Sequence, residues 1–189
     1  MQKNQFPKQT HFVGVLVPDD LTLTLEDCRR YMNETYGCKS GYGTPVHVTL
    51  VPPFHLDDKF STRDIARSIQ QEMSSLSGGI RKFNARIENF DAFGDRTIFA
   101  KVLDDKKWIN LRNLVFQAVL KIAPNSLKKD SRPFVPHLTV ANRDIPQGSS
   151  VAALKVLNEL ELQEDFPVDN VTIFERRQSR WISTCSIEL

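Results

Sequence analysis

The stretch TPVHVTLVPPF, residues 44–54, alternates polar and apolar side chains in a way that is typical of a strand with two different faces. Side chains two positions apart in a strand point to the same side of the sheet, so His47 and Thr49 share one face. Val48 and Leu50 share the other face. We expect the aliphatic pair to pack into a core and the polar pair to project away from it.

The stretch RPFVPHLTVAN, residues 132–142, repeats the pattern with His137 and Thr139 on one face and Leu138 and Val140 on the other. The chain has 11 threonines in 189 residues, so two of its four histidines would be followed by threonine at the second position in roughly 2% of chance arrangements. Apolar residues on either side and a matching position in each half lower that chance further. The pair of His-x-Thr motifs is therefore informative where a single one would not be.

The elements around the two motifs are expected to follow one another in the same order. In each half of the chain, the sequence pattern predicts a strand, a helix, the His-x-Thr strand, a second helix and a further strand. Such a duplication predicts two similar lobes related by an approximate two-fold axis. The expected segments outside the motif strands are strands 11–18, 82–93, 96–103, 169–177 and 180–189 and helices 21–36, 62–76, 106–123 and 149–160.

Two helices carry recognisable end signals. Thr24 is the expected N-cap of the first helix, and Gly37 lies just past its end. Ser61 and Asp64 have the spacing of a capping box at the start of the second helix.

Composition predicts an ordinary globular protein with one bilobal domain over residues 1–189, because 40% of the residues are hydrophobic and 25% are charged. A net charge of +2 is too small to indicate a surface that binds duplex DNA. Cys28, Cys38 and Cys185 have neither disulfide-framework nor metal-site spacing. With no signal peptide or membrane-spanning run in the sequence, we expect a cytoplasmic protein with reduced thiols and no membrane contact. The oligomeric state stays open.

Two lobes that bring their polar strand faces together would enclose two imidazoles and two hydroxyls in a single cleft. Displacement at phosphorus places the attacking and leaving oxygens on opposite sides, and a two-fold axis supplies a base and an acid from opposite directions. Histidine serves either role near neutral pH, and threonine hydroxyls can donate to phosphate oxygens. No carboxylate is spaced to join these histidines as a metal ligand, so we expect neither a metal nor another cofactor.

The motifs HVTL and HLTV resemble the paired His-x-Thr/Ser motifs of the two-histidine phosphoesterase superfamily. Their flanks resemble in particular its 2′-5′ RNA ligase branch, the LigT-like cyclic phosphodiesterases. The resemblance implies an α+β fold with two lobes, antiparallel sheets around a central cleft, and metal-independent chemistry on 2′,3′-cyclic or related phosphoesters. It also implies acid–base roles for His47 and His137 and phosphate contacts for Thr49 and Thr139. Which histidine is the base cannot be read from the motifs.

Further residues are candidates for substrate binding. Three aromatic residues, Tyr42, Phe54 and Trp181, have the chemistry to stack on a nucleobase, although core packing is the competing interpretation for Phe54. Arg143 and Arg177 have the charge to bind a phosphate, against the alternative that each is a solvated surface charge. We interpret His11 and His55 as structural or surface residues.

The leading hypothesis is a phosphodiesterase that acts on a 2′,3′-cyclic phosphate, a 2′-5′ linkage or a related RNA or nucleotide phosphoester. Its partner would be an RNA end or a nucleotide. A rival of another class is an RNA- or nucleotide-binding module without turnover. A third possibility is a ligase that forms 2′-5′ bonds by the reverse reaction, and the residues alone do not distinguish these directions.

Overall fold

The computed structural model describes residues 8–41, 43–75, 79–103, 106–127 and 133–189, and these residues form an α+β fold. The strands are β1 (His11–Leu16), β2 (His47–Phe54), β3 (Phe83–Ala92), β4 (Thr97–Val102), β5 (His137–Asn142), β6 (Gln163–Val168), β7 (Asn170–Arg177) and β8 (Arg180–Glu188). The helices are α1 (Asp19–Tyr36), α2 (Thr62–Ser75), α3 (Lys106–Ile122) and α4 (Ser150–Asn158). Among these residues, every helix is too short or too polar to cross a bilayer.

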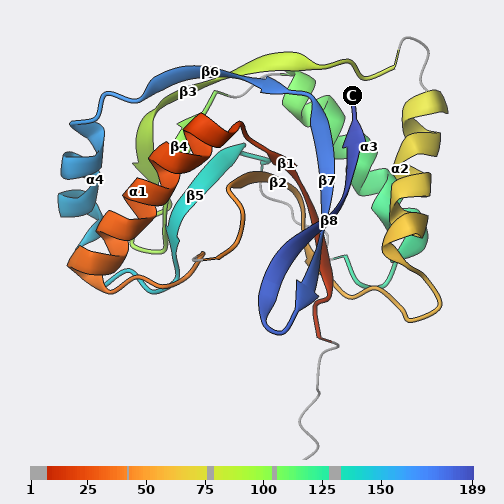
Figure 1. The fold of residues 1–189 in the computed structure, drawn as a ribbon, viewed down its shortest axis with the longest axis horizontal. Helices are drawn as coiled ribbons and strands as arrows, with labels where there is room; N and C mark the ends of the chain where they lie inside the picture. The colour runs from red at the N-terminus through yellow and green to blue at the C-terminus, as the bar shows by residue number, and fades with distance from the viewer. Residues whose placement is uncertain (1–7, 42, 76–78, 104–105, 128–132) are drawn as a thin grey trace, which may run out of the picture.

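All eight of these strands belong to one curled antiparallel sheet, in the order β6-β3-β4-β5-β2-β1-β7-β8 (Figure 1). The two motif strands, β5 and β2, are neighbours at its centre. The sheet therefore consists of two four-stranded halves that meet between the His-x-Thr motifs, an arrangement consistent with two lobes. The predicted fold class is confirmed, with the refinement that the antiparallel strands of both lobes are continuous.

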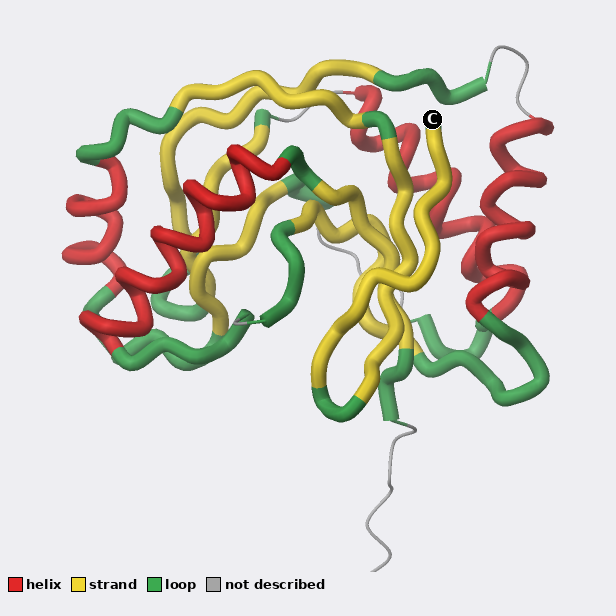
Figure 2. The backbone as a smooth tube through the Cα atoms, in the orientation of Figure 1, coloured by secondary structure: helices red, strands yellow, loops and turns green. Residues whose placement is uncertain are grey.

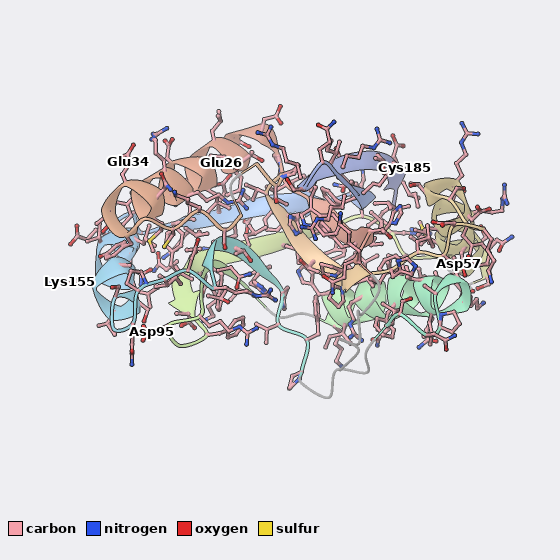
Figure 3. The ribbon with its side chains drawn as sticks, turned by 90° about the horizontal axis from the view of Figure 1, so that it is seen from below. Glu26, Glu34, Asp57, Asp95, Lys155 and Cys185 are labelled. Atoms are coloured by element: carbon pink, nitrogen blue, oxygen red, sulfur yellow. The ribbon has the colours of Figure 1, made fainter. Side chains whose placement is uncertain are left out.

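The helices cover the two ends of the sheet in pairs. Helices α2 and α3 pack against each other and against β2, β7 and β8, whereas α1 packs on β5 and α4 on β3. Figure 2 shows the strands as an arch between these two helix pairs, and the view from below in Figure 3 places Glu26 of α1 and Lys155 of α4 at one end of the molecule. Each half of the sheet draws elements from both halves of the chain, unlike the successive halves expected from the sequence: β7, β8 and α3 join β1 and β2, whereas β3 and α1 join β4 and β5.

The alternation predicted for the motif strands is present in both. Val48 and Leu138 are fully buried, and Leu50 and Val140 are each 2% exposed. The histidine and threonine of each motif are half-buried on the opposite side of the strand. Packing of the aliphatic face against helices thus turns both polar faces to the same side of the sheet.

Local signals predicted some element boundaries better than others. Gly37 ends α1 in the left-handed conformation with φ of 73°, and Asp64 accepts hydrogen bonds from the backbone and hydroxyl of Ser61 at the start of α2, as expected. The prediction for Thr24 was wrong, because α1 begins five residues earlier at Asp19 and the Thr24 hydroxyl donates to the carbonyl of Asp20 inside the helix.

Strand β6 was missed in the sequence. It lies at the edge of the sheet and contains Pro167, a residue that weakens a strand prediction because it lacks the N–H of a sheet ladder.

Candidate functional site

The two motif histidines are anchored in the same way. Nδ1 of His47 lies 2.7 Å from the carbonyl oxygen of Pro45, and Nδ1 of His137 lies 2.7 Å from the carbonyl oxygen of Val135. A carbonyl oxygen can only accept, so Nδ1 of each ring carries the hydrogen. In the neutral imidazole this leaves Nε2 as the nitrogen that takes up a proton, and each ring is oriented by the backbone two residues before it.

The register of the central strands brings the four polar side chains onto one face. Val48 pairs with Leu138 in the antiparallel β2–β5 ladder. Continuing that register places His47 opposite Thr139 and Thr49 opposite His137, where cross-strand Cβ atoms are typically ~4.5–5.5 Å apart. The two imidazoles then occupy a diagonal of this face, and the charge of His137 influences the pKa of His47.

Each imidazole rests against two phenylalanine rings from neighbouring parts of the sheet. Around His47 the ring centroids of Phe12 and Phe174 lie at 4.6 and 5.2 Å, and these two rings stack on each other. Around His137 the centroids of Phe99 and Phe93 lie at 5.1 and 5.4 Å. The aromatic rings exclude water from one side of each imidazole.

This environment disfavours the charged form of both rings. Burial lowers the pKa of His47 to about 4, against the raising effect of the Pro45 carbonyl, and the positive charges of Arg29 and His137 lower it further. Burial also lowers the pKa of His137, and the hydrogen bond to the Val135 carbonyl opposes this. At neutral pH His47 is therefore an uncharged imidazole whose Nε2 can accept a proton.

A cavity of about 780 Å³ opens beside the motif strands. Its lining combines both motif threonines with His47, three arginines and Trp181. His137 is half-buried next to it on β5, although the ring is not part of the lining. The lining includes Phe12, Arg29, His47, Thr49, Thr139, Arg143, Arg176 and Trp181. A cavity of this size and polarity suits a small anionic ligand.

The structure brings some of the expected substrate-binding residues to this cavity and corrects others. Arg143 and Trp181 line it, and Tyr42 falls outside the described residues. Phe54 does not have a face for a nucleobase, because its ring is 1% exposed in the core. Arg177 does not line the cavity either: it is exposed and ion-paired with Glu175 at 2.9 Å. Its neighbour Arg176 lines the cavity instead, 5.8 Å from the Trp181 ring, because successive side chains of a strand point to opposite faces.

Arg29 is a site residue that sequence reasoning missed. It lines the cavity, yet its side chain is only 3% exposed. The signal was available in the spacing, because Arg29 falls four residues after Leu25 and three before Met32, on the buried face of α1. A charged residue on the apolar face of an amphipathic helix is buried on folding and needs hydrogen-bond or ion-pair partners to offset its loss of hydration.

The described part of the chain has no candidate metal-binding cluster. No group of three or more histidine, cysteine, aspartate or glutamate side chains there is arranged to hold a metal ion.

Comparison with known proteins supports one family. Residues 17–180 match the family model of the 2′-5′ RNA ligase superfamily. The fold is similar to that of LigT from E. coli, crystallised with 3′-AMP, with 15% identity, a TM-score of 0.61, and coverage of 96% of this chain and 98% of LigT. It is also similar to TT0787 of Thermus thermophilus, with 18% identity, a TM-score of 0.67, and coverage of 95% of this chain and 97% of TT0787. The comparison with curated protein sequences found no match.

Substituting Gly14 tests how closely β1 approaches the first histidine. Gly14 pairs with Thr49, and a Cβ there would lie 2.7 Å from the carbonyl oxygen of Val48 and 3.2 Å from Cδ2 of His47. In Gly14→Ala we expect the His47 imidazole and the β1–β2 pairing to shift, because the new methyl group would clash with the Val48 carbonyl oxygen, which can move only if the backbone of β2 moves. NMR of the His47 ring should show changed chemical shifts together with lower stability to urea.

Gly94→Ala is the matched control for this change. Gly94 has φ of 58°, so alanine is strained there, but a Cβ meets nothing within 4 Å. This variant should lose stability without moving the His47 signals. Unchanged His47 signals in Gly14→Ala would contradict the close approach.

Stability should fall as the pH drops below the ordinary histidine value of 6.5. Burial lowers the pKa of His11, His47 and His137, so the unfolded chain binds protons that the folded chain resists. The loss begins near pH 6.5 and for His47 continues to its folded value of about 4. Urea unfolding of the wild type and of His47→Gln at about pH 7 and about pH 5 should show a weaker pH dependence in the variant. Identical dependence in both proteins would contradict the burial of a neutral His47.

Proposed function

The chain belongs to the 2′-5′ RNA ligase superfamily, and on this premise we propose that it is a metal-independent phosphodiesterase of RNA ends or nucleotides. Its substrate would be a 2′,3′-cyclic phosphate, a 2′-5′ linkage or a related phosphoester. One observation carries the proposal. Two imidazoles with the same Nδ1 anchor project from the same face of adjacent strands, each with Nε2 left to exchange a proton.

The reaction proposed is an in-line displacement at phosphorus. Nε2 of one histidine removes a proton from the attacking water or ribose hydroxyl as the new P–O bond forms. The opposite P–O bond breaks, and the second histidine gives its proton to the leaving oxygen. For a cyclic phosphate attacked by water, the product is a phosphomonoester with a free ribose hydroxyl, and each histidine ends in the protonation state with which the other began.

The remaining polar groups have roles that follow from their charge. The hydroxyls of Thr49 and Thr139 would donate to the non-bridging oxygens, where negative charge accumulates in the transition state. Arg143 and Arg176, at the lining of the same cavity, would attract the anionic substrate.

Ligands of similar structures support a nucleotide as substrate. E. coli LigT has been crystallised with 3′-AMP, with phosphate and with ATP. For this chain we propose an RNA end or a nucleotide as the partner rather than duplex DNA, since the net charge is +2. A cytoplasmic location remains part of the proposal, and Cys28, Cys38 and Cys185 all carry free thiols.

A second candidate function is nucleotide binding without turnover. The observation that favours it is that both motif histidines have a lowered pKa, whereas acid–base catalysis needs one of them protonated. A bound phosphate would restore the proton by placing negative charge beside the rings. Formation of 2′-5′ bonds is the reverse of the proposed reaction, and its direction depends on substrate concentrations rather than on these residues.

Removing either imidazole should abolish most turnover. We expect His47→Ala and His137→Ala each to lower kcat for a 2′,3′-cyclic nucleotide by ~10²–10⁴-fold, the usual contribution of a general acid or base. Wild-type activity should survive EDTA. His55→Ala is the matched control, because His55 is a half-buried histidine that lies outside the cavity lining and is bonded to the carbonyl of Lys8. Full activity in either motif variant would refute the proposal, and wild-type binding without product would favour the binding module.

Trp181 should contribute to substrate affinity rather than to chemistry. Its ring lines the cavity and makes a T-shaped contact with Phe12, with centroids 4.9 Å apart, and we propose that it stacks on a nucleobase. Trp181→Ala should raise KM by ~5–150-fold, the equivalent of losing one stacked base, with little change in kcat. Trp181→Phe should recover most of that loss. Ile182→Ala, at the exposed neighbouring position, should leave KM unchanged; equal KM values in all variants would argue against stacking.

A further inference from the structure

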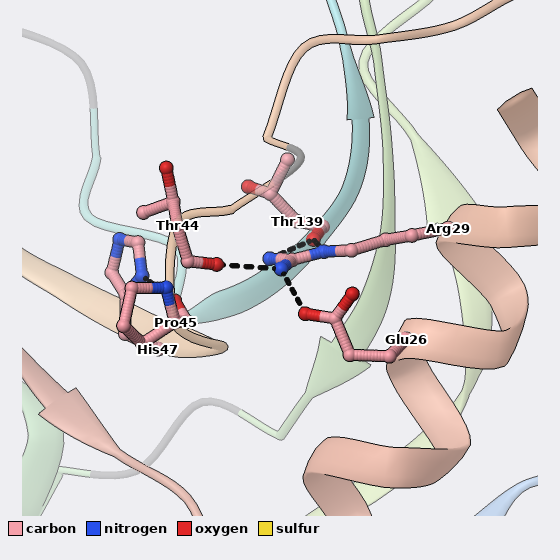
Figure 4. A network of polar contacts seen from close by, with 6 residues as sticks. All are labelled: Glu26, Arg29, Thr44, Pro45, His47 and Thr139. Atoms are coloured by element: carbon pink, nitrogen blue, oxygen red, sulfur yellow. Dashed lines mark hydrogen bonds and ion pairs between the residues drawn. The ribbon is translucent and has the colours of Figure 1, made fainter. Parts of the chain in front are cut away.

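Arg29 joins two segments that are far apart in the sequence. From α1 it extends between the motif strands, where Nη1 donates to the carbonyl oxygen of Thr44 at 2.7 Å (Figure 4). Nε and Nη2 both donate to the carbonyl oxygen of Thr139, at 3.2 and 3.1 Å. The same guanidinium therefore holds the segment before the first motif and the backbone of the second motif.

Each acceptor lies near one of the two motifs in the sequence. Thr44 precedes Pro45, whose carbonyl accepts the hydrogen bond from Nδ1 of His47. Thr139 belongs to the second motif, two residues after His137. Among the described residues, the backbone register between β2 and β5 is defined at Val48 and Leu138, so Arg29 adds a cross-link where the sheet halves meet.

Burying this cation is expensive, and its surroundings show how the cost is offset. Glu26, one turn earlier on α1, forms an ion pair with Nη1 at 2.7 Å. Four of the five N–H groups of a guanidinium are then bonded within the protein: Nε to Thr139, Nη1 to Glu26 and to Thr44, and Nη2 to Thr139. An apolar side chain would fill the space with less desolvation, so packing alone does not explain an arginine here.

The bonding pattern also separates Arg29 from the groups that would touch substrate. Four of its five donors are committed to the Glu26 carboxylate and to backbone carbonyls, whereas Arg143 and Arg176 at the cavity lining remain candidates for an anion. Arg29 therefore acts through the atoms that it holds.

We propose that Arg29 is a positioning residue for the two-histidine site: its guanidinium fixes the Thr44–Pro45 segment against the Thr139 backbone and thereby sets how the two imidazoles face each other. This inference rests on the proposed phosphodiesterase function. It assigns to a buried helix residue a role that neither His-x-Thr motif contains.

The charge of Arg29 provides a readout that a merely structural role would not change. The positive charge of Arg29 from α1 and that of protonated His137 from β5 act on His47. Arg176 from β7 and Arg143, just after β5, line the same cavity, and Glu26 is the anion beside Arg29. The positive charge of Arg29 lowers the pKa of His47. Removing that charge should raise the pKa of His47 and move the acidic limb of a pH–rate profile to higher pH.

Three variants of the full chain separate geometry from charge. Arg29→Lys keeps the charge but, as a compact ammonium on a flexible stem, cannot hold both carbonyls as the planar fork does. Arg29→Met removes charge and hydrogen bonds together. Arg30→Met is the control on the exposed side of α1, where Arg30 pairs with Asp27.

Steady-state kinetics with a 2′,3′-cyclic nucleotide is the first measurement. We expect Arg29→Lys and Arg29→Met to lose ~10–100-fold in kcat, the effect of a small misplacement of reacting groups, with KM changed far less. Arg30→Met should match the wild type. Wild-type kcat in a folded Arg29→Lys protein would overturn the proposal.

NMR titration of the His47 ring is the second measurement, and it needs no turnover. Arg29→Met should raise the pKa of His47, and Arg29→Lys should change it less because the charge remains. If Arg29→Met is unstable, Glu26→Gln is the alternative variant, because it removes the negative charge paired with Arg29. The positive charge of Arg29 is then no longer balanced, and the pKa of His47 should fall. If the wild type shows no turnover, the proposed function fails while these titrations still test Arg29. An unchanged His47 titration in Arg29→Met would overturn the role of the charge.

Discussion

The pairing of β2 with β5 is the constraint on which the site depends. These strands come from different halves of the chain, and their register, defined at Val48 and Leu138, decides which side chains share a face. A slip of one residue would turn one motif from the cavity into the core, because strand side chains alternate. Burial of Val48 and Leu138 against the helices opposes such a slip, so the packing of one face specifies the chemistry of the other.

Core formation also prepares the imidazoles electrostatically. The phenylalanine rings beside the imidazoles, Phe12 and Phe174 at His47 and Phe99 with the more exposed Phe93 at His137, reduce the contact of both histidines with water. The resulting loss of solvation costs stability in acid but leaves neutral rings that can accept protons at physiological pH. An anionic substrate would relieve this penalty for whichever ring becomes charged, which couples substrate binding to the protonation that catalysis requires.

The periodicity of the sequence predicted the strands and helices that have one buried and one exposed face. It predicted least well the residues and elements whose position depends on contacts with distant parts of the chain. The motif strands and the buried side of β3 follow the expected alternation. Strand β6 escaped because Pro167 is tolerated at a sheet edge, which cannot be recognised before the sheet order is known. Whether Arg176 or Arg177 faces the cavity depends on which side of β7 each side chain points to near the β7–β8 hairpin. Whether Phe54 can contact a ligand depends on which side of β2 packs into the core. The burial of Arg29 could have been predicted from its spacing to Leu25 and Met32, but its place beside the motifs depends on the packing of α1 on β5, which local sequence does not encode.

The backbone order is nearly symmetric about the centre of the sheet, but the surroundings of the two imidazoles are not. Gly14 faces Thr49 where Phe99 faces Thr139, so the two rings are supported by different strand positions. Arg29 adds positive charge on the His47 side, and the pKa of His47 is lowered by burial, by Arg29 and by His137. For His137 burial is the lowering cause. A proton entering the pair is therefore better accommodated on His137, and in the proposed displacement at phosphorus this inequality would give two chemically identical side chains different tasks.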